Sequence, residues 1–268
     1  MRRVSGLLLV WLLFAVAAYG AGTSDHIAYS KRWIRGIPVH VVTADLNVLD
    51  VRVSTAIARN GIGTAEGFGS MLSRLQPTAA ITGTYFCMKS LVPVGDIVID
   101  GRLVNIGTVG TGVCFKADNT VEFRSARGAG AMDWADCESV VCAGPRLVTN
   151  GAAYVAPWAE GFRDRSHYRK ARRSALGITR HNKLLLLAVT RPVYLSKLAK
   201  IMRDLGAVDA VSLDGGSSTA LYYRGRVLSH PGRRLTNLIV VYESADKFAR
   251  VKPALAPSPL AARTSQKS

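Results

Sequence analysis

The chain alternates between short apolar runs and polar breaks over most of its length, a pattern that is typical of β-strands. Residues 39–42 and 51–58 are rich in β-branched side chains with polar interruptions, as half-buried strands are. Residues 81–86 and 210–213 predict buried strands, and residues 235–242 predict the last strand of the fold. Strands therefore dominate the expected structure.

Three further segments each predict a β-hairpin. Residues 96–104, 113–123 and 175–190 hold two apolar arms around a polar centre. The first should turn at Asp100-Gly101, a dipeptide whose backbone tolerates the positive φ angles of tight turns. The other two have an Asp-Asn pair and a His-Asn pair at their centres. Because hairpins join antiparallel neighbours, most of the sheet is expected to be antiparallel.

Helices are fewer in the predicted structure. Residues 68–75 predict a short helix, and residues 194–205 predict a longer one, because apolar side chains recur there at helical spacing. Gly206 follows as a helix stop. These elements predict an α+β fold: a single domain with a mixed or antiparallel β-sheet and a few packed helices.

The two ends of the chain differ in composition from its centre. Residues 1–22 hold Arg2 and Arg3, then an uncharged apolar run and small residues, which predicts a signal peptide. An uncleaved N-terminal anchor is the alternative. Residues 26–244 are expected to form the domain, and residues 245–268, with three prolines among Ala, Lys, Arg and Ser, a disordered tail. The protein is thus expected to be exported, periplasmic or extracellular, and not an integral membrane protein after cleavage.

The chain is strongly basic, with 35 Lys and Arg against 18 Asp and Glu and a formal net charge of +17. In an exported protein this charge favours anionic glycans, phosphate-bearing polymers or an anionic envelope surface as partners. Nucleic acid is not expected, because no RNA-binding aromatic motif or helix-turn-helix pattern accompanies the charge. A basic bias of the whole proteome would explain the same charge without any such partner.

Four cysteines follow the predicted signal peptide, and an even number in an exported chain indicates disulfides. Three pairings are possible; in one of them the close pair Cys137 and Cys142 would close a short loop, leaving Cys87 with Cys114. Free, buried thiols are the alternative. A zinc site is disfavoured because there is no Cys-x-x-Cys pair and no nearby set of histidines. We therefore expect no cofactor and assign no metal ligand.

The main candidate for chemistry follows a predicted buried strand. Asp214 stands at the end of this strand as a hydrogen-bond acceptor or general base. Gly215 and Gly216 let the backbone turn sharply and approach a ligand, and successive amides there can bind an anion. Ser217 and Ser218 add hydroxyl donors. The alternative is that this Asp-Gly-Gly sequence is only a tight turn.

Two other segments carry side chains that suit a sugar or an anion. Arg173 opens a strand after a basic loop, and an arginine fork matches a phosphate or carboxylate better than lysine does. Gly83 permits close approach of the backbone, and Tyr85 or Phe86 could stack on a sugar ring. The alternatives are a solvated arginine and, for Phe86 above all, an aromatic side chain packed in the core.

Together these segments resemble the phosphodiester glycosidase family. Its members show an Asn-Gly-Gly-Tyr/Phe-Phe strand, Pro-x-Gly with Asp-Gly, Gly-Pro-x-Leu-Val, Arg-Thr-Ala-x-Gly, Asn-Leu-Asp-Gly-Gly-x-Ser and a final Arg-x-x-x-Asn strand. The corresponding motifs stand here in the same order, at residues 83–86, 93–95, 144–148, 173–177, 213–218 and 233–237. Two departures from the family pattern matter for the chemistry, because Thr82 and Ser212 stand where the family usually has asparagine.

The resemblance implies hydrolysis of the bond between a sugar's anomeric carbon and a phosphodiester, or of a related glycosidic bond of a cell-envelope or extracellular glycan. Asp214 is the implied catalytic residue, which would activate water or stabilise a cationic sugar. The implied substrate- and phosphate-binding residues are Thr82, Gly83, Tyr85, Arg173, Gly215, Gly216, Ser217, Ser218, Arg233 and Asn237.

Two other functions are consistent with the same residues. A non-catalytic module could bind anionic envelope polysaccharide through the same cleft, and the replaced asparagines at Thr82 and Ser212 favour it. A peripheral membrane protein could be held at an anionic surface by its net charge alone. Turnover of a glycosyl phosphodiester would separate the enzyme from both.

Overall fold

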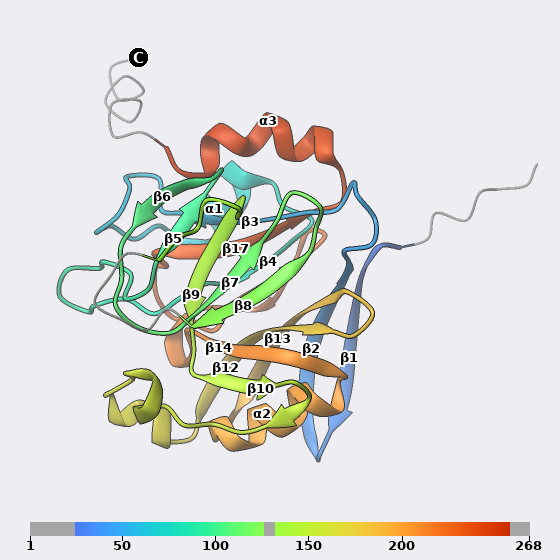
Figure 1. Cartoon of the computed structure of the whole chain (residues 1–268), viewed down its shortest axis with the longest axis vertical. Helices are drawn as coiled ribbons and strands as arrows, with labels where there is room; N and C mark the ends of the chain where they lie inside the picture. The colour runs from blue at the N-terminus through green and yellow to red at the C-terminus, as the bar shows by residue number, and fades with distance from the viewer. Residues whose placement is uncertain (1–24, 126–131, 258–268) are drawn as a thin grey trace, which may run out of the picture.

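The computed structural model describes residues 25–125 and 132–257. The predicted signal peptide, residues 1–22, and the end of the expected tail, residues 258–268, lie outside the described residues. Within the described ranges three β-sheets pack together and three α-helices lie against them (Figure 1). Every strand pairing there is antiparallel. The predicted α+β single-domain class is therefore confirmed.

The largest sheet has seven strands in the order β1-β2-β13-β12-β14-β10-β11. Its strands are β1 (Ile27–Ile34), β2 (Ile37–Asp45), β10 (Arg146–Thr149), β11 (Ala152–Ala153), β12 (Ala171–Thr179), β13 (Lys183–Val193) and β14 (Ala207–Leu213). The helix α2 (Leu195–Asp204) confirms the predicted long helix and packs its buried side chains against β10 and β14. Leu198 and Met202, one helical turn apart, lie in that contact.

The other two sheets have five strands each, in the orders β16-β15-β4-β17-β3 and β6-β5-β9-β7-β8. The first comprises β3 (Arg52–Ile57), β4 (Ala79–Thr82), β15 (Leu221–Tyr223), β16 (Arg226–Ser229) and β17 (Asn237–Tyr242). The second comprises β5 (Ile97–Ile99), β6 (Arg102–Asn105), β7 (Thr111–Phe115), β8 (Val121–Ser125) and β9 (Ser139–Ala143). The predicted short helix is confirmed as α1 (Phe68–Leu75).

One apolar cluster joins all three sheets. It includes Val42 and Leu213 of the seven-stranded sheet, Ile81 and Ile239 of the sheet that holds β4, and Val113 of the third, all fully buried. Alternate side chains of each strand face this core because the strand repeat is two residues. The core thereby fixes strands of different sheets against one another and brings strand ends together at one place.

The predicted hairpin turns are confirmed. The turn between β5 and β6 places Asp100 at φ 55° and Gly101 at φ 67°. The turn between β7 and β8 holds Asn119 at φ 64°, and that between β12 and β13 holds Asn182 at φ 52°. Asparagine and aspartate tolerate this left-handed region better than most side chains do, which is why these dipeptides marked the turns.

The expected disordered tail is wrong over its first half, because residues 245–255 form the helix α3 (Ala245–Leu255). The Ser244 hydroxyl accepts a hydrogen bond from the Lys247 N–H (3.3 Å) and caps the helix. Phe248 and Leu255, seven residues apart, are buried on one face. The composition of the segment obscured this helical spacing. No helix in the described part of the chain has the length and apolar character needed to cross a membrane.

The expected disulfide is confirmed, but it is not the pairing of Cys137 with Cys142. Cys114 of β7 forms a disulfide with Cys137, which precedes β9, whereas Cys87 is exposed and free and Cys142 is buried and free. Most of the stretch between Cys137 and Cys142 is extended strand, which separates their Cα atoms by roughly 16 Å, too far for a disulfide. Closeness in the sequence therefore did not indicate which cysteines form the disulfide.

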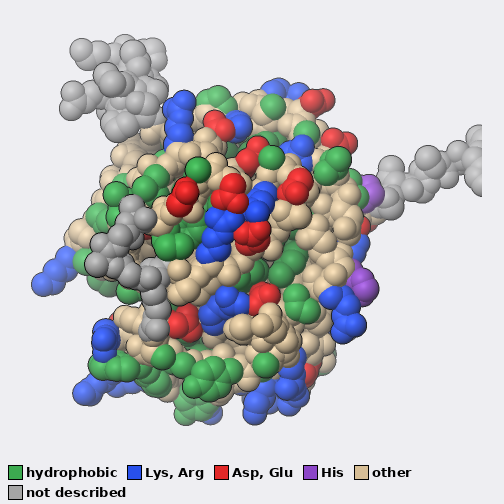
Figure 2. Space-filling view, in the orientation of Figure 1, with side chains coloured by type: hydrophobic (Ala, Val, Ile, Leu, Met, Phe, Trp, Pro, Cys, Tyr) green, Lys and Arg blue, Asp and Glu red, His purple; other side chains and the backbone are tan. Residues whose placement is uncertain are grey.

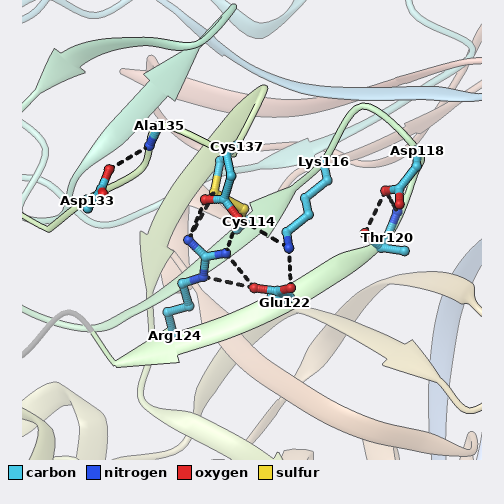
Figure 3. A network of polar contacts seen from close by, with 10 residues as sticks. Cys114, Lys116, Asp118, Thr120, Glu122, Arg124, Asp133, Ala135 and Cys137 are labelled. Carbon is cyan, nitrogen blue, oxygen red and sulfur yellow. Dashed lines mark hydrogen bonds and ion pairs between the residues drawn. A yellow bond between two sulfur atoms is a disulfide. The ribbon is translucent and has the colours of Figure 1, made fainter.

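A network of four charged side chains lies beside this disulfide (Figure 3). Arg124 of β8 donates to the carboxylates of Asp136 (2.6 and 2.8 Å) and Glu122 (2.9 Å). Lys116 contacts the same two carboxylates, Asp136 at 3.2 Å. Because Asp136 adjoins Cys137, the network and the disulfide fix the same stretch of chain against the β7–β8 hairpin.

Candidate functional site

A cavity of about 430 Å³ lies at the ends of β4, β12 and β14. Its walls include the loop that follows β4, Thr108 and Val109, the loop before β17, and residues 161–167. The last of these belong to residues 157–169, named here the η segment, which contains the 3-10 turns η1 (Trp158–Glu160) and η2 (Arg165–Tyr168). In Figure 1 the η segment is the olive coil at the lower left.

Backbone contacts between strands of different sheets position this cavity. The Asp214 N–H donates to the Gly83 carbonyl oxygen (2.9 Å), which fastens the end of β14 to the end of β4. In the seven-stranded sheet Ser174 of β12 pairs with Leu213 of β14, so Arg173 and Asp214 leave neighbouring strands at the same level. Arg173 and Tyr85, which are about 40 and 130 positions before Asp214 in the chain, thus share one cavity with it.

Asp214 stands at the floor of the cavity, directly after β14. Its Oδ1 accepts a hydrogen bond from the Gly215 N–H (2.8 Å), and the Ser218 hydroxyl also bonds to the carboxylate. Burial raises the pKa of Asp214 to about 6, although those two hydrogen bonds and the charge of Arg233 oppose the rise. The group can therefore take up or release a proton near neutral pH, as an acid–base catalyst must.

The two glycines after Asp214 make the turn that the sequence predicted. A Cβ atom on Gly215 would lie 2.8 Å from the Arg172 carbonyl oxygen, and Gly216 has a φ of +58°, in the left-handed region. Both conditions favour glycine. Gly216 begins the 3-10 turn η3 (Gly216–Ser218), which turns the buried Ser218 back toward Asp214 and leaves Ser217 exposed.

Arg173 lines the same cavity but is only 4% exposed. Its guanidinium donates to the carbonyl oxygens of Ser166 (3.2 Å), Arg169 (2.5 Å) and Val193 (3.3 Å). Burial lowers its pKa, yet a guanidinium keeps its charge in a protein. Among residues 25–125 and 132–257 no carboxylate forms an ion pair with it. Arg173 thus anchors the η segment and adds positive charge to the cavity.

Arg233 supplies a second cation from the loop before β17. Its guanidinium lies 4.6 Å from the centre of the Phe86 ring, and its Nη1 donates to the Met88 sulfur (3.0 Å). Phe86 itself is half-buried in the cavity wall, which contradicts the expectation that it packs in the core. The reason is that β4 ends at Thr82, so the strand alternation that would have turned Phe86 inward no longer applies.

Three aromatic rings form another wall. The Tyr85 ring lies 5.8 Å from Phe162 and 5.2 Å from His167, and the last two are 5.2 Å apart, all edge to face. The Tyr85 hydroxyl bonds to the Ser212 hydroxyl (3.1 Å), and burial raises its pKa well above the ordinary value. One of the positions that departs from the family pattern, Ser212, therefore lies behind Tyr85.

His167 belongs to this wall and was not among the residues that the sequence analysis selected. The side chain is 7% exposed, and its Nδ1 has no hydrogen-bond partner among the described residues. Burial and the nearby charge of Arg173 lower the pKa of His167, so the ring stays neutral at pH 7. A neutral imidazole in the wall can donate one hydrogen bond from its protonated nitrogen and accept one at the other.

Not every residue implied by the family resemblance touches the cavity. Asp214, Arg173, Tyr85, Gly215, Gly216 and Arg233 line it, whereas Thr82, Gly83, Ser217, Ser218 and Asn237 do not. The Asn237 amide holds the Thr84 backbone instead: Oδ1 accepts from the Thr84 N–H (2.7 Å) and Nδ2 donates to its carbonyl (3.2 Å). Gly83 leaves room for that amide, because a Cβ there would lie 1.9 Å from Asn237 Oδ1.

The fold and cavity together define an antiparallel α+β protein with a pocket lined by acidic, basic and aromatic side chains. The family model for phosphodiester glycosidases matches residues 76–242, more than half of the chain. The chain belongs to the phosphodiester glycosidase family, as its motifs predicted. No curated protein matches it significantly.

Solved structures share the fold. A hypothetical protein from Synechocystis superposes with a TM-score of 0.68 at 17% identity, covering 81% of this chain and 62% of its own. The catalytic domain of zebrafish N-acetylglucosamine-1-phosphodiester alpha-N-acetylglucosaminidase, auto-inhibited by its pro-peptide, gives 0.65 at 20% identity, covering 81% and 82%. A presumed exported protein from Burkholderia pseudomallei gives 0.60 at 15% identity, covering 77% and 74%. This chain therefore spans less than two thirds of the Synechocystis protein.

Proposed function

We propose that this protein hydrolyses the bond between a sugar's anomeric carbon and a phosphodiester, or a related glycosidic bond, in a cell-envelope or extracellular glycan. The observation that carries the proposal is the half-buried Asp214 carboxyl, with a pKa of about 6, in one cavity with Arg173 and Arg233. Membership of the phosphodiester glycosidase family supports the reaction class. The Cys114–Cys137 disulfide and the presumed exported neighbour support an exported protein.

The chemistry of the leaving group explains why arginines matter in such a site. A phosphate released from an anomeric carbon is already anionic and only weakly basic, so it needs charge stabilisation more than a strong general acid. Arg233, half-buried and facing Phe86, and the buried Arg173 supply that charge. The Gly215 N–H already donates to Asp214, so the proposed phosphate contact falls to the arginines and to Gly216.

Asp214 then acts on the sugar side of the bond. In its ionised form it can take a proton from an attacking water or stabilise the positive charge that develops at the anomeric carbon. The other acid in the described lining is Asp164, whose carboxylate accepts the Ser166 N–H (2.7 Å) and caps η2. Its capping role leaves Asp214 as the acid for catalysis.

The test is turnover of synthetic sugar-1-phosphate diesters, beginning with an N-acetylglucosamine-1-phosphate methyl ester, as the name of the zebrafish neighbour indicates. Asp214→Asn and Arg233→Ala should each lower kcat/KM by about 100-fold or more. Arg234→Ala is the matched control, because this exposed neighbour donates to the Ala65 carbonyl and does not line the cavity. Since the catalytic form is the carboxylate, kcat/KM should fall as the pH drops below about 6.

Folded Asp214→Asn and Arg233→Ala proteins with unchanged turnover would overturn these assignments. Binding of the diesters without any hydrolysis would favour the non-catalytic envelope module instead. Thr82 and Ser212, the two departures from the family pattern, are both buried and line no part of the cavity. Restoring asparagine at either position tests whether the departures limit catalysis.

A further inference from the structure

An exposed tryptophan lies beside a residue that lines the cavity. Trp158 of η1 is 59% exposed. Arg163, five residues later, lines the cavity, and its Cζ lies 3.8 Å from the centre of the Trp158 ring. Covering a large exposed aromatic surface with a ligand is favourable, because it removes apolar area from water. The binding surface can therefore continue from the cavity onto Trp158.

The segment that carries this pair is held in place from several sides. The Glu160 carboxylate accepts the Arg146 N–H through both oxygens (2.9 and 3.0 Å). The Phe162 N–H donates to the Pro157 carbonyl (3.0 Å), and Arg173 holds the far end of the η segment through the Ser166 carbonyl. A ligand that stacks on Trp158 therefore meets a preorganised surface and pays little ordering entropy.

The pairing of ring and guanidinium matches one repeat of a sugar–phosphate chain. The Arg163 Cζ lies over the Trp158 ring, and a contact of this kind does not use the N–H groups at the edge of the guanidinium. In the described part of the chain none of those donors has a hydrogen-bond acceptor or a carboxylate partner. A pyranose offers an apolar C–H face to an aromatic ring, and its phosphate accepts bidentate hydrogen bonds from arginine.

The same pairing occurs inside the cavity, where Arg233 lies 4.6 Å from the Phe86 ring. Phe86, Arg233 and Arg163 all line the cavity, so one arginine–aromatic pair lies inside it and the other joins it to Trp158. Figure 2 shows Lys and Arg side chains along the lower edge of the view, where Figure 1 draws the η segment and α2. The net charge of +17 also attracts a polyanionic ligand to the protein.

We propose that Trp158 and Arg163 form a second glycosyl-phosphate subsite, so that the substrate is a polymer of sugar–phosphodiester repeats and not a single capped sugar. One repeat lies over Asp214 beside the Arg233–Phe86 pair, and the next stacks on Trp158 with its phosphate at Arg163. The inference rests on the proposed function, because it assumes that the cavity cleaves such bonds.

The experiment compares synthetic substrates that contain one, two and three sugar-1-phosphate repeats. For the wild type, kcat/KM should rise between one and two repeats and then level off. Trp158→Ala should lower the ratio of kcat/KM for two repeats over one by about tenfold, the effect of losing one stacking contact. Arg163→Gln should lower the same ratio and make it less sensitive to salt, because it removes a phosphate contact. Trp33→Ala is the matched control, since Trp33 is 71% exposed on β1 and lines no part of the cavity.

The outcomes separate this inference from the proposed function. Hydrolysis of none of the substrates refutes the proposed function itself. Hydrolysis with the same kcat/KM for one and two repeats, or an equal loss on both in Trp158→Ala, refutes the second subsite while the proposed function stands. An equal fall of the ratio in Trp33→Ala would show a non-specific effect of tryptophan loss and would also overturn the subsite.

Discussion

Replacement of Asp214 by asparagine is expected to stabilise the protein while it removes the proposed catalytic group. Burial raises the pKa of Asp214 from its ordinary value of 3.8 to about 6. Each pKa unit corresponds to about 1.4 kcal/mol, so ionisation of this carboxyl costs the folded state roughly 3 kcal/mol relative to the unfolded chain. Asparagine keeps the shape and the acceptor oxygen for the Gly215 N–H but carries no charge.

Because folding raises the pKa of Asp214, the stability difference between the two proteins depends on pH. A carboxyl whose pKa is raised on folding stabilises the folded state below pH 3.8, and this contribution is lost as the pH rises to about 6. Asp214→Asn should therefore be more stable than the wild type by roughly 3 kcal/mol at pH 8, with the difference shrinking toward zero below pH 4.

Urea unfolding of both proteins at several pH values measures this difference. Asp118→Asn is a control of opposite sign, because hydrogen bonds from Thr120 lower the pKa of Asp118 and its charge favours the folded state at neutral pH. The reasoning would be refuted if Asp214→Asn had a lower unfolding free energy than the wild type at pH 8. It would also be refuted if the variant exceeded the wild type by the same unfolding free energy at pH 4 and at pH 8.

Two further predictions concern the stability of the fold. Cys114→Ser with Cys137→Ser opens a disulfide that spans 23 positions, which should cost about 3 kcal/mol of unfolding free energy, and reduction of the wild type should reproduce the loss. Gly83→Ala should cost roughly 3 kcal/mol in thermal unfolding, because its Cβ would displace the buried Asn237 amide. Gly69→Ala, where the added Cβ meets nothing within 4 Å, should leave the protein as stable or slightly more so.

Features that depend on local backbone rules could be predicted from the sequence. Asp100-Gly101 forms the expected turn because both residues tolerate a positive φ, and α2 forms because its apolar side chains recur at helical spacing. Gly215 and Gly216 make the expected turn after Asp214 for the same kind of reason. In these cases the information lies within a few residues of the element itself.

Features set by tertiary contacts could not be predicted. His167 lies in the cavity wall because Arg173 holds the backbone on both sides of it, through the carbonyl oxygens of Ser166 and Arg169. No regular spacing of residues in the sequence indicates that contact. The pairing of Cys114 with Cys137 likewise depends on how β7 lies beside the stretch before β9.

The register of the seven-stranded sheet explains how the cavity keeps two opposite charges separate. Ser174 pairs with Leu213, so one more step of the same antiparallel register would set Arg173 directly opposite Asp214, a geometry that favours an ion pair. Instead β14 ends at Leu213 and Gly215 turns the chain, and the Asp214 carboxylate bonds to its own Gly215 amide. An ion pair with Arg173 would have lowered the pKa of Asp214, whereas burial without that partner raises it to about 6. The glycine turn therefore gives the cavity both an acid that titrates near neutral pH and an arginine whose charge is available to an anion.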